Sequence, residues 1–249
     1  MRIFLVALTA AVMTLLLGPT VIVARLLRVP QGPRSIYSWC VRTWARAINA
    51  AAGVSVVVHG AERLDQASGA VFVSYHVSWF DIFALASVLP WCSFVAKVEL
   101  RKIPLFGFAA ECVGIVFLER ENRKQAFASY EIAAKEVRRG RAIVVCPEGT
   151  RGHDYHLRPF KKGPFVLAIA SESPVIPTVV HGTIQIMPKG SFWIRPGRVD
   201  LHFLEPIAAA GYDYEHRAAL MTETWTRMAD VLRTTYGTST SEHPVANQA

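Results

Sequence analysis

The chain has 249 residues, of which 52% are hydrophobic and only 18% are charged, so it has ample material for the core of one α/β domain with an appendage. The 27 Lys and Arg residues against 19 Asp and Glu give a net charge of +8, which favours anionic partners such as phospholipid head groups, phosphorylated metabolites and acidic carriers. No block of about five or six like charges occurs, and this argues against a basic tail for nucleic acid.

The N-terminal stretch is apolar enough to meet a membrane. Ile3–Ala24 contains 22 residues without a charge, interrupted only by Gly18 and Pro19. A spanning helix needs about 20 apolar residues, whereas a signal peptide is shorter and ends in a small-x-small cleavage site. The basic stretch Arg25–Arg28 follows and favours a cytoplasmic position for that end.

A second helix is predicted from Arg34 to Ala52, with polar side chains at helical spacing on one side and apolar side chains on the other. One interpretation is an interfacial helix, with the indoles of Trp39 and Trp44 at head-group depth and arginines on lipid phosphates. The alternative is a surface helix docked on the core. Residues 1–52 are therefore predicted either as one span plus an interfacial helix, or as a helical pair in one leaflet with Gly18-Pro19 near the bend.

Residues 53–237 alternate short β-branched runs with helical patterns, which predicts a single α/β domain with a mixed, largely parallel sheet flanked by helices. The predicted strands are residues 54–58, 70–74, 94–96, 114–118, 141–146, 175–180 and, as an edge strand, 199–203. The predicted helices are residues 125–139, residues 164–170 and a final helix that carries Met221, Trp225, Met228 and Leu232 on one stripe and ends at Gly237. Residues 238–249 are polar and are predicted to be disordered.

The four cysteines lie in apolar stretches and form no C-x-x-C pair; they are Cys40, Cys92, Cys112 and Cys146. Such isolated cysteines are typical of buried, reduced thiols on the cytoplasmic side. A zinc site requires clustered Cys and His residues, and because that spacing is missing we expect no bound metal.

His76 and Asp81 lie five residues apart in the stretch SYHVSWFD, between two apolar runs. The pair follows a predicted strand at the entrance to a helix, where side chains can face a cleft. An aspartate that accepts from one imidazole nitrogen sets the tautomer and leaves the other nitrogen as a base. The alternative is a structural histidine that is hydrogen-bonded near a helix start.

A second polar cluster, Cys146–Arg151, follows the strand at residues 141–146. Gly149 allows a tight turn, and the charged Glu148 and Arg151 need partners because they adjoin a buried strand end. Thr150 and Arg151 are suited to hold an anion, since arginine donors match phosphate oxygens. The alternative is a surface turn with a local ion pair.

Two further clusters follow strands. Glu119 and Arg120 come directly after residues 114–118, and the alternative to a functional role is a charged loop. Val175–Pro177 places a proline in a strand, which by itself favours an edge strand or a strand start.

Several enzyme classes lack their motifs in this chain: no G-x-S-x-G elbow, no phosphate-binding G-x-x-x-x-G-K-[ST] or G-x-G-x-x-G loop, and no H-E-x-x-H pair occur. The sequence thus offers a histidine base without an obvious protein nucleophile, beside arginines suited to phosphate. That combination fits direct attack by a substrate hydroxyl that His76 activates.

Taken together, the clusters resemble the lysophospholipid acyltransferase family, the bacterial 1-acylglycerol-3-phosphate O-acyltransferases. The four blocks of the family are similar, in order, to His76–Asp81 (H-x4-D), Gly114–Arg120, Pro147–Arg151 and Val175–Pro177. Lys97–Leu100 and Ile103–Gly107 resemble the segment between the first two blocks, and the whole resemblance spans residues 54–205.

The resemblance implies transfer of an acyl group from acyl-CoA or acyl-carrier protein to the free hydroxyl of lysophosphatidate, giving phosphatidate for phospholipid synthesis without a cofactor. His76, oriented by Asp81, would be the base, and Arg120 and Arg151, with Lys97, would hold the phosphate of the acceptor. The residues implied to shape the turn of the third block are Glu148, Gly149 and Thr150. The implied location is the inner (cytoplasmic) membrane, with the active site facing the cytoplasm.

The chain departs from the usual family pattern at four positions, which are Tyr75, Glu119, Cys146 and Gly152. These departures leave the acceptor open, and another lysolipid such as lyso-ornithine lipid, or glycerol-3-phosphate, is an alternative. An alternative from another class is a catalytically idle lipid-binding homologue, against which His76 and Asp81 argue. The dispersed basic residues argue against nucleic acid as a partner.

Overall fold

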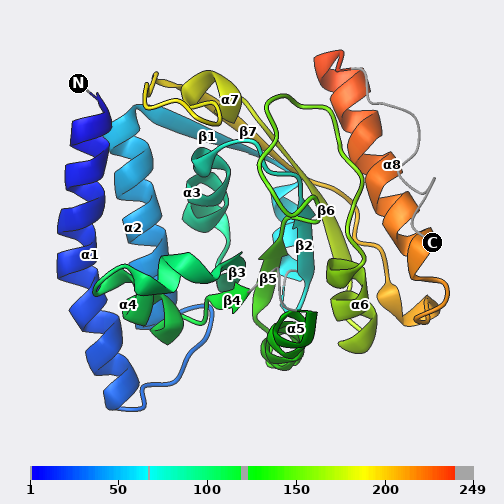
Figure 1. Ribbon diagram of the computed structural model, residues 1–249, viewed down its shortest axis with the longest axis horizontal. Coiled ribbons are helices and arrows are strands. Elements are labelled where there is room, and N and C mark those ends of the chain that lie inside the picture. The colour runs from blue at the N-terminus through cyan, green and yellow to red at the C-terminus, as the bar shows by residue number, and fades with distance from the viewer. Residues whose placement is uncertain (1, 67, 119–122, 239–249) are drawn as a thin grey trace.

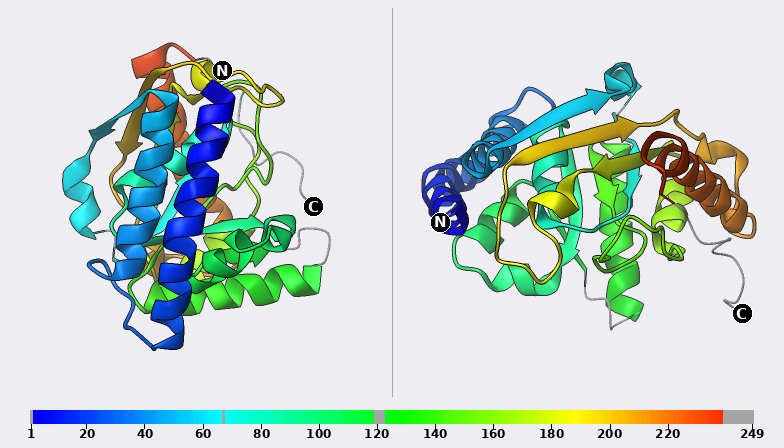
Figure 2. Two further views of the ribbon diagram at one scale, coloured as in Figure 1. Left: turned by 90° about the vertical axis from the view of Figure 1, so that its left-hand side faces the viewer. Right: turned by 90° about the horizontal axis from the view of Figure 1, so that it is seen from above.

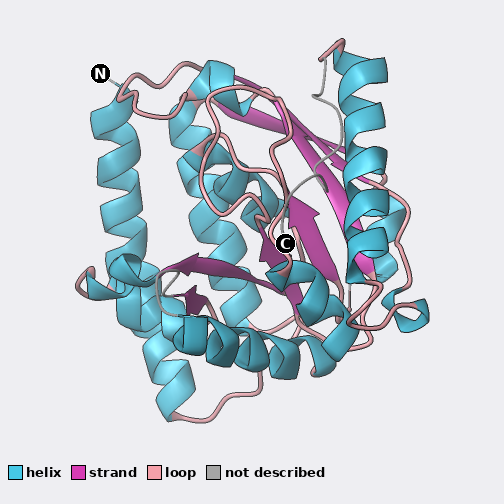
Figure 3. Ribbon diagram, turned by 45° about the vertical axis from the view of Figure 1, so that its right-hand side comes forward, coloured by secondary structure: helices cyan, strands magenta, loops and turns pink. Residues whose placement is uncertain are grey.

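The computed structural model describes residues 2–66, 68–118 and 123–238, in which a seven-stranded sheet lies between two layers of helices (Figures 1 and 3). The strands are β1 (Val54–His59), β2 (Val71–Ser74), β3 (Cys92–Lys97), β4 (Val116–Leu118), β5 (Ala142–Val145), β6 (Val175–His181) and β7 (Gly197–Phe203). The α-helices are α1 (Arg2–Leu26), α2 (Ile36–Ala52), α3 (Trp79–Val88), α4 (Phe106–Cys112), α5 (Arg123–Arg138), α6 (Gly163–Ala170), α7 (Thr183–Ile186) and α8 (Arg217–Tyr236).

The strand order is β1-β7-β6-β2-β5-β3-β4, and neighbouring strands are parallel except for β6 and β7. The predicted mixed, largely parallel sheet is therefore confirmed. The prediction of an edge strand at residues 199–203 is wrong, because β7 lies between β1 and β6. Along β7, buried Val199, Leu201 and Phe203 alternate with partly exposed polar residues, a pattern that a half-buried edge strand shares.

The central strands β2 and β5 are buried at every position, because helices cover both faces of the sheet. Successive side chains of a strand point to opposite faces. Val71 and Val73 accordingly pack in the core beneath α5, α6 and α8, whereas Phe72 packs in the core beneath α2 and α3. Residues that follow β2 therefore emerge between the two helical layers.

Pro177 lies inside β6, which is an interior strand, although the proline alone favoured an edge or a strand start. β6 pairs with β2 through residues 175–178 and with β7 from Thr178 onward. The carbonyl of Pro177 accepts from the Leu204 nitrogen at 3.0 Å, just beyond the ladder with β7. The missing N–H of the proline thus falls where the β7 pairing ends, which makes it tolerable in an interior strand.

The helix α1 is continuous through Pro19 and lies beside the domain for its whole length (Figures 1 and 2). By length and composition it is long and apolar enough to cross a membrane, the one such helix in the described part of the chain. The chain reverses between α1 and α2 at residues 27–35. The prediction of a bend near Gly18-Pro19 is therefore wrong; at Gly18 the helix instead comes close to Leu105, whose side chain lies 3.2 Å from the position of an added Cβ.

The helix α2 is docked on the core, and two of its polar side chains contact α3. Trp44 donates to the Thr14 hydroxyl of α1 at 3.0 Å, whereas Trp39 is 51% exposed; the placement of these indoles at head-group depth stays a prediction. Arg46 donates to the Ser87 carbonyl at 3.0 Å and Asn49 to the Phe83 carbonyl at 3.1 Å, so both polar side chains satisfy carbonyls of α3. A pattern of polar residues on one side does not distinguish lipid phosphates from the carbonyls of a neighbouring helix.

The division of the chain at residue 52 into a membrane-anchoring segment and a domain stays a prediction. In the structure α2 contributes Ala45, Ile48 and Ala52 to the same core as the sheet. The predicted stop at Gly237 is confirmed, since this glycine caps α8 in the left-handed conformation. The tail beyond residue 238 lies outside the described residues.

Cys40, Cys92 and Cys112 are buried as expected, and burial raises the pKa of Cys40 to about 11 and that of Cys92 to about 12.

Candidate active site

His76 and Asp81 meet between the end of β2 and the start of α3. The His76 Nδ1 and Asp81 Oδ2 atoms are 2.8 Å apart, and Asp81 is only 1% exposed. The same Oδ2 accepts from the backbone nitrogens of Val77 and Ser78, each at 2.8 Å. The other oxygen, Oδ1, accepts from the Thr183 hydroxyl at 2.5 Å. Donors therefore engage both oxygens of a carboxylate that the protein encloses.

The local sequence explains this geometry. Ser78 is the N-cap of α3 and Asp81 is its third residue, so the two form a capping box. An ionised carboxylate only accepts hydrogen bonds, and hence His76 donates through Nδ1 and keeps the lone pair on Nε2. Asp81 thus stabilises the helix start and sets the imidazole tautomer. The expected arrangement of a carboxylate-oriented histidine at a strand-to-helix connection is present.

The turn at residues 146–152 follows β5 and is joined to the histidine loop. The Gly152 nitrogen donates to the His76 carbonyl at 2.7 Å. Gly149 has a φ of +75°, where an L side chain is strained, and its nitrogen donates to the Cys146 carbonyl at 3.1 Å. The tight turn predicted at Gly149 is therefore present, and it carries Thr150 and Arg151 past the imidazole.

Glu148 is buried and finds a partner that lies ten residues along the chain. Its Oε2 accepts from the Arg158 guanidinium at 2.5 Å, and its Oε1 accepts from the Arg158 nitrogen at 3.2 Å. The same guanidinium donates to the Thr150 carbonyl at 2.8 Å. Burial raises the pKa of Glu148, and Arg158 opposes that rise. The structure therefore gives Glu148 a part in holding the turn together.

The three predicted phosphate ligands have different surroundings. The Arg151 guanidinium lies over the ring of Trp79, 4.9 Å from its centroid, and the Arg151 carbonyl accepts from Lys189 at 2.8 Å. The Lys97 side chain is 61% exposed and pairs with Glu99 at 2.6 Å. Arg120, together with Glu119, lies outside the described residues.

A cavity of about 1850 Å³ opens beside these residues. His76, Lys97, Gly149, Thr150 and Arg151 line it, while apolar side chains of α1, α2, α3 and α4 form the walls. Ligand pockets usually measure roughly 300 to 1,000 Å³, so this cavity has room for more than one long apolar group. The lining is mainly apolar but also carries His76, Arg151 and the charged side chains of Glu131, Lys135, Arg138, Lys161 and Lys162, a combination that suits amphiphilic substrates.

Sequence reasoning missed Thr183, Arg158 and Lys189, which hold the site residues in place. Thr183 lies two residues after the end of β6, and polar residues at the carboxyl ends of parallel strands gather at one edge of a sheet. This rule could have pointed to Thr183 as a residue near the site. Arg158 and Lys189 lie in loops, and no spacing pattern points to them.

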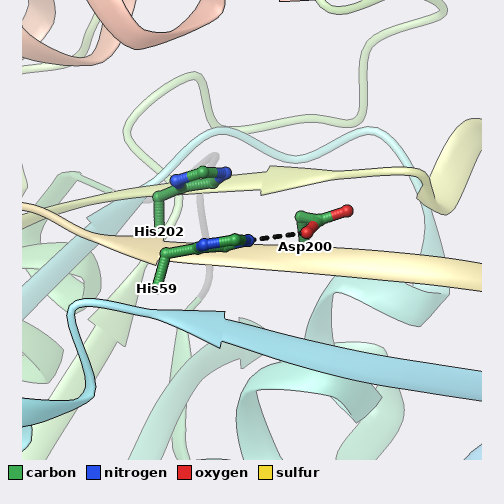
Figure 4. A group of neighbouring side chains, drawn as sticks. All are labelled: His59, Asp200 and His202. Atoms are coloured by element: carbon green, nitrogen blue, oxygen red, sulfur yellow. Dashed lines mark hydrogen bonds and ion pairs between the residues drawn. The ribbon is translucent and has the colours of Figure 1, made fainter. Parts of the chain in front are cut away.

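A second group of ligand-type side chains lies on β1 and β7 (Figure 4). His59 Nε2 is 2.7 Å from Asp200 Oδ1, and the ring of His59 stacks on that of His202 with the centroids 4.2 Å apart. The Arg198 guanidinium donates to both Asp200 oxygens, at 2.6 and 3.0 Å. Since a cation of the chain already occupies this carboxylate, we assign no metal to the group. Burial, followed by the neighbouring His59, lowers the pKa of His202 to about 4.

The model of the Acyltransferase family matches residues 55–181, a range that contains the histidine, the aspartate and the turn described above. The chain belongs to the acyltransferase family. This assignment agrees with the resemblance of its four blocks, three of which lie fully among the described residues, the exception being Gly114–Arg120.

Several proteins with similar sequences are named 1-acyl-sn-glycerol-3-phosphate acyltransferases. The putative 1-acyl-sn-glycerol-3-phosphate acyltransferase acl-2 of Caenorhabditis elegans is 32% identical over 180 residues, which are 71% of this chain and 61% of the worm protein. The chloroplastic 1-acyl-sn-glycerol-3-phosphate acyltransferase BAT2 of Brassica napus is 33% identical over 64% of this chain and 46% of that protein. The 1-acyl-sn-glycerol-3-phosphate acyltransferase of Saccharomyces cerevisiae is 29% identical over 85% of this chain and 71% of the yeast protein. The acyltransferase thus spans about half to three fifths of the worm and Brassica proteins.

The crystal structure of the 1-acyl-sn-glycerophosphate acyltransferase PlsC from Thermotoga maritima has the same fold. Its TM-score with this acyltransferase is 0.75 at 23% identity, over 94% of this chain and 96% of that chain. The likeness confirms the predicted fold class over nearly the whole chain.

Proposed function

We propose that this acyltransferase moves a fatty acyl group from acyl-CoA or acyl-carrier protein to the free hydroxyl of 1-acylglycerol-3-phosphate, giving phosphatidate. The observation that carries the proposal is the His76–Asp81 pair, whose histidine lines a large and mainly apolar cavity. The names of the relatives point to the same acceptor. No cofactor is proposed, because a thioester is already an activated acyl donor.

The chemistry needs a base and correct positioning. The lone pair on His76 Nε2 takes the proton of the acceptor hydroxyl while the hydroxyl oxygen bonds to the thioester carbonyl carbon. The carbon–sulfur bond then breaks, and the thiolate takes the proton back from the imidazolium. Asp81 stabilises the imidazolium between these steps, as the aspartate does in other carboxylate–histidine pairs. No covalent bond between the acyl group and the protein is required.

Arg151 is the proposed phosphate ligand that the described residues support best. It lines the cavity, and its guanidinium is held over Trp79 beside the histidine loop. A planar guanidinium can donate two parallel hydrogen bonds to phosphate oxygens. Arg120 and Lys97 are proposed to assist, and the turn around Gly149 and Thr150, held by Glu148 and Arg158, is proposed to set the distance between the phosphate and the base.

We further propose that the protein lies on the cytoplasmic face of the inner membrane, with α1 in one leaflet. The helix α1 contributes Thr14 and Gly18 to the cavity wall and packs on α2 and α4, so it is part of the domain. A helix crossing the bilayer at this position would carry the polar surface of the domain into hydrocarbon, which is costly. Its outer face instead exposes large apolar side chains, among them Phe4, Leu8 and Leu15. An in-plane helix lets a bilayer lipid enter the cavity from the side.

The test uses purified protein in mixed micelles with a labelled acyl-CoA and, separately, a labelled acyl-carrier protein. Parallel reactions contain lysophosphatidate, lyso-ornithine lipid or glycerol-3-phosphate. Label is expected in phosphatidate, and His76→Ala is expected to abolish the transfer. A matched control is His216→Ala, because this histidine is exposed at the start of α8.

The outcomes separate the parts of the proposal. Label in another acceptor alone would contradict the substrate and leave the chemistry intact. Full activity of His76→Ala would contradict the mechanism. Absence of transfer from either donor to any acceptor would contradict the function itself.

A further inference from the structure

The segment between α7 and β7 exposes two aromatic side chains side by side in the sequence. Phe192 and Trp193 are each 77% exposed, as much as Phe4 at the start of α1. The next residue, Ile194, is only 7% exposed and belongs to the core beneath α2 and α3. We call residues 188–195 the aromatic loop. Two fully presented aromatic rings next to a buried anchor residue indicate a surface made for an apolar partner.

The aromatic loop has its own hydrogen bonds and is closed at its base. The Ser191 nitrogen donates to the Pro188 carbonyl at 3.1 Å, and the Trp193 nitrogen donates to the Ser191 hydroxyl at 3.0 Å. At the base, the Arg195 nitrogen donates to the Ile186 carbonyl at 3.0 Å. The exposure of the two rings therefore follows from a defined turn, in which the chain leaves the core and returns to it.

The base of the aromatic loop is joined to the candidate active site. The Ser78 hydroxyl, which caps α3 beside the His76–Asp81 pair, donates to the carbonyl of Met187 at 2.7 Å. Lys189 donates to the carbonyl of Arg151 at 2.8 Å. Both contacts join the loop to the elements that carry the base and the proposed phosphate ligand. Whatever the tip of the loop binds is therefore held at a defined position relative to the site.

Charge and position indicate the partner. Residues 182–199 contain Lys189, Arg195 and Arg198 and no acidic residue; Arg198 pairs with Asp200, so Lys189 and Arg195 are the cations that flank the aromatic rings. The loop lies at the same end of the molecule as the N-terminus of α1 (Figure 2), and Pro196 and the Arg2 side chain both come within 3.0 Å of an added Cβ at Gly53. Aromatic rings flanked by cations suit the boundary between anionic head groups and acyl chains.

We propose that the aromatic loop is a second bilayer contact, which inserts Phe192 and Trp193 at head-group depth into a membrane with anionic lipids and holds the site against the lipid surface. The first contact is the exposed apolar face of α1. The inference rests on the proposed function in that the acceptor is a bilayer lipid. Its consequence is that the loop assists capture of an acceptor from a membrane and has no part in the chemical step.

The first experiment measures insertion directly. Tryptophan fluorescence of the full chain is recorded with vesicles of phosphatidylcholine and phosphatidylglycerol whose acyl chains are brominated near the head group. Bromine is expected to quench the wild-type protein more than Trp193→Phe, and the difference between the two is the signal of Trp193. Equal quenching of both proteins would overturn the proposal. A difference that persists unchanged with phosphatidylcholine alone would overturn the anionic part of it.

The second experiment measures the consequence for activity. The double variant Phe192→Ser/Trp193→Ser is compared with the wild type on a long-chain acceptor in vesicles and on a short-chain, water-soluble acceptor. Because interfacial binding scales with buried apolar area, kcat/KM on vesicles is expected to fall about tenfold while kcat/KM on the soluble acceptor stays unchanged. The control is Ile132→Ser, which removes an apolar side chain on α5 that is 55% exposed; it is expected to leave both values unchanged.

The outcomes distinguish this proposal from the proposed function. Equal loss on both acceptors would show that the loop supports the site itself and would overturn the membrane role. A change of the double variant from dimer to monomer in detergent-free buffer would assign the rings to a second copy of the chain and would also overturn it. If the wild type transferred no acyl group to either acceptor, the proposed function would fail, whereas the quenching measurement would still decide whether the loop contacts lipid.

Discussion

Replacement of Thr183 by valine tests the arrangement of the candidate base through a residue that touches no substrate. Valine keeps the shape of threonine and removes its hydroxyl, which is the donor to Asp81 Oδ1 at 2.5 Å. Asp81 is 1% exposed and Thr183 is fully buried, so water cannot take the place of the lost donor. The remaining donors to Asp81, from His76, Val77 and Ser78, all address the other oxygen.

The expected loss of stability follows from the number of donors that remain on Asp81. A hydrogen bond to a buried charged group contributes about 1.5 to 3 kcal/mol, and Thr183→Val is expected to lower the free energy of unfolding by about that amount. If about half of that free energy is also lost when Asp81 stabilises the imidazolium, kcat falls by about 4- to 13-fold. The KM for the acceptor should not change, because Thr183 lies behind the carboxylate.

Thr183→Ser is the matched variant, since it restores the hydroxyl, and it is expected to recover most of the lost kcat. The assay is steady-state transfer from acyl-CoA to lysophosphatidate in micelles, with urea unfolding followed in parallel. A folded Thr183→Val protein with wild-type kcat would refute the reasoning. So would a serine variant as slow as the valine variant, because the loss would then stem from packing.

Three further changes test other contacts. Arg158→Ala leaves Glu148 buried without its cation and is expected to lower the free energy of unfolding by about 2 to 3 kcal/mol in urea titrations. The pKa of Glu148 is raised in the folded state, and the loss should be larger above that pKa, where the carboxylate is ionised, than below it. A loss that does not depend on pH would contradict this reasoning. The pKa of His202 is lowered from 6.5 to about 4, so between these two pH values the folded state binds fewer protons than the unfolded state. Stability should fall by about 1 to 2 kcal/mol as the pH drops through the window, allowing for the half-exposed ring, and His202→Gln should flatten that slope. Gly149→Ala, at a φ of +75°, should cost about 1 to 2 kcal/mol and slow acyl transfer, whereas Gly190→Ala, with a φ of +83° but no neighbour near its Cβ, should cost stability alone.

Features that depend on residues close together in the chain can be predicted from the amino-acid sequence. The Ser78–Asp81 capping box places an aspartate within five residues of His76, so one short stretch specifies the helix start and the imidazole partner together. Gly149 specifies a turn because it relieves a local steric conflict. The alternation of strands and helices likewise predicts a largely parallel sheet, since parallel neighbours require crossover connections.

The distant residues that complete these features become visible in the folded chain. Thr183 reaches Asp81 across 102 positions of the chain, and Gly152 reaches His76 through a backbone hydrogen bond that no side-chain pattern records. The interior place of β7 follows from its pairing with both β1 and β6, whereas its own alternating burial resembles that of an edge strand.

The surroundings of Trp44 were decided in the same way. The position of a tryptophan on a helix beside an apolar segment does not say which neighbour its indole contacts, and the structure shows a hydrogen bond to Thr14 of α1. The cavity is likewise formed by α1 to α4 and the loops after the strands together. Periodicity along a chain describes which face of an element is apolar, but the partner of that face depends on packing between segments far apart in sequence, and the enclosed space exists only after they have packed.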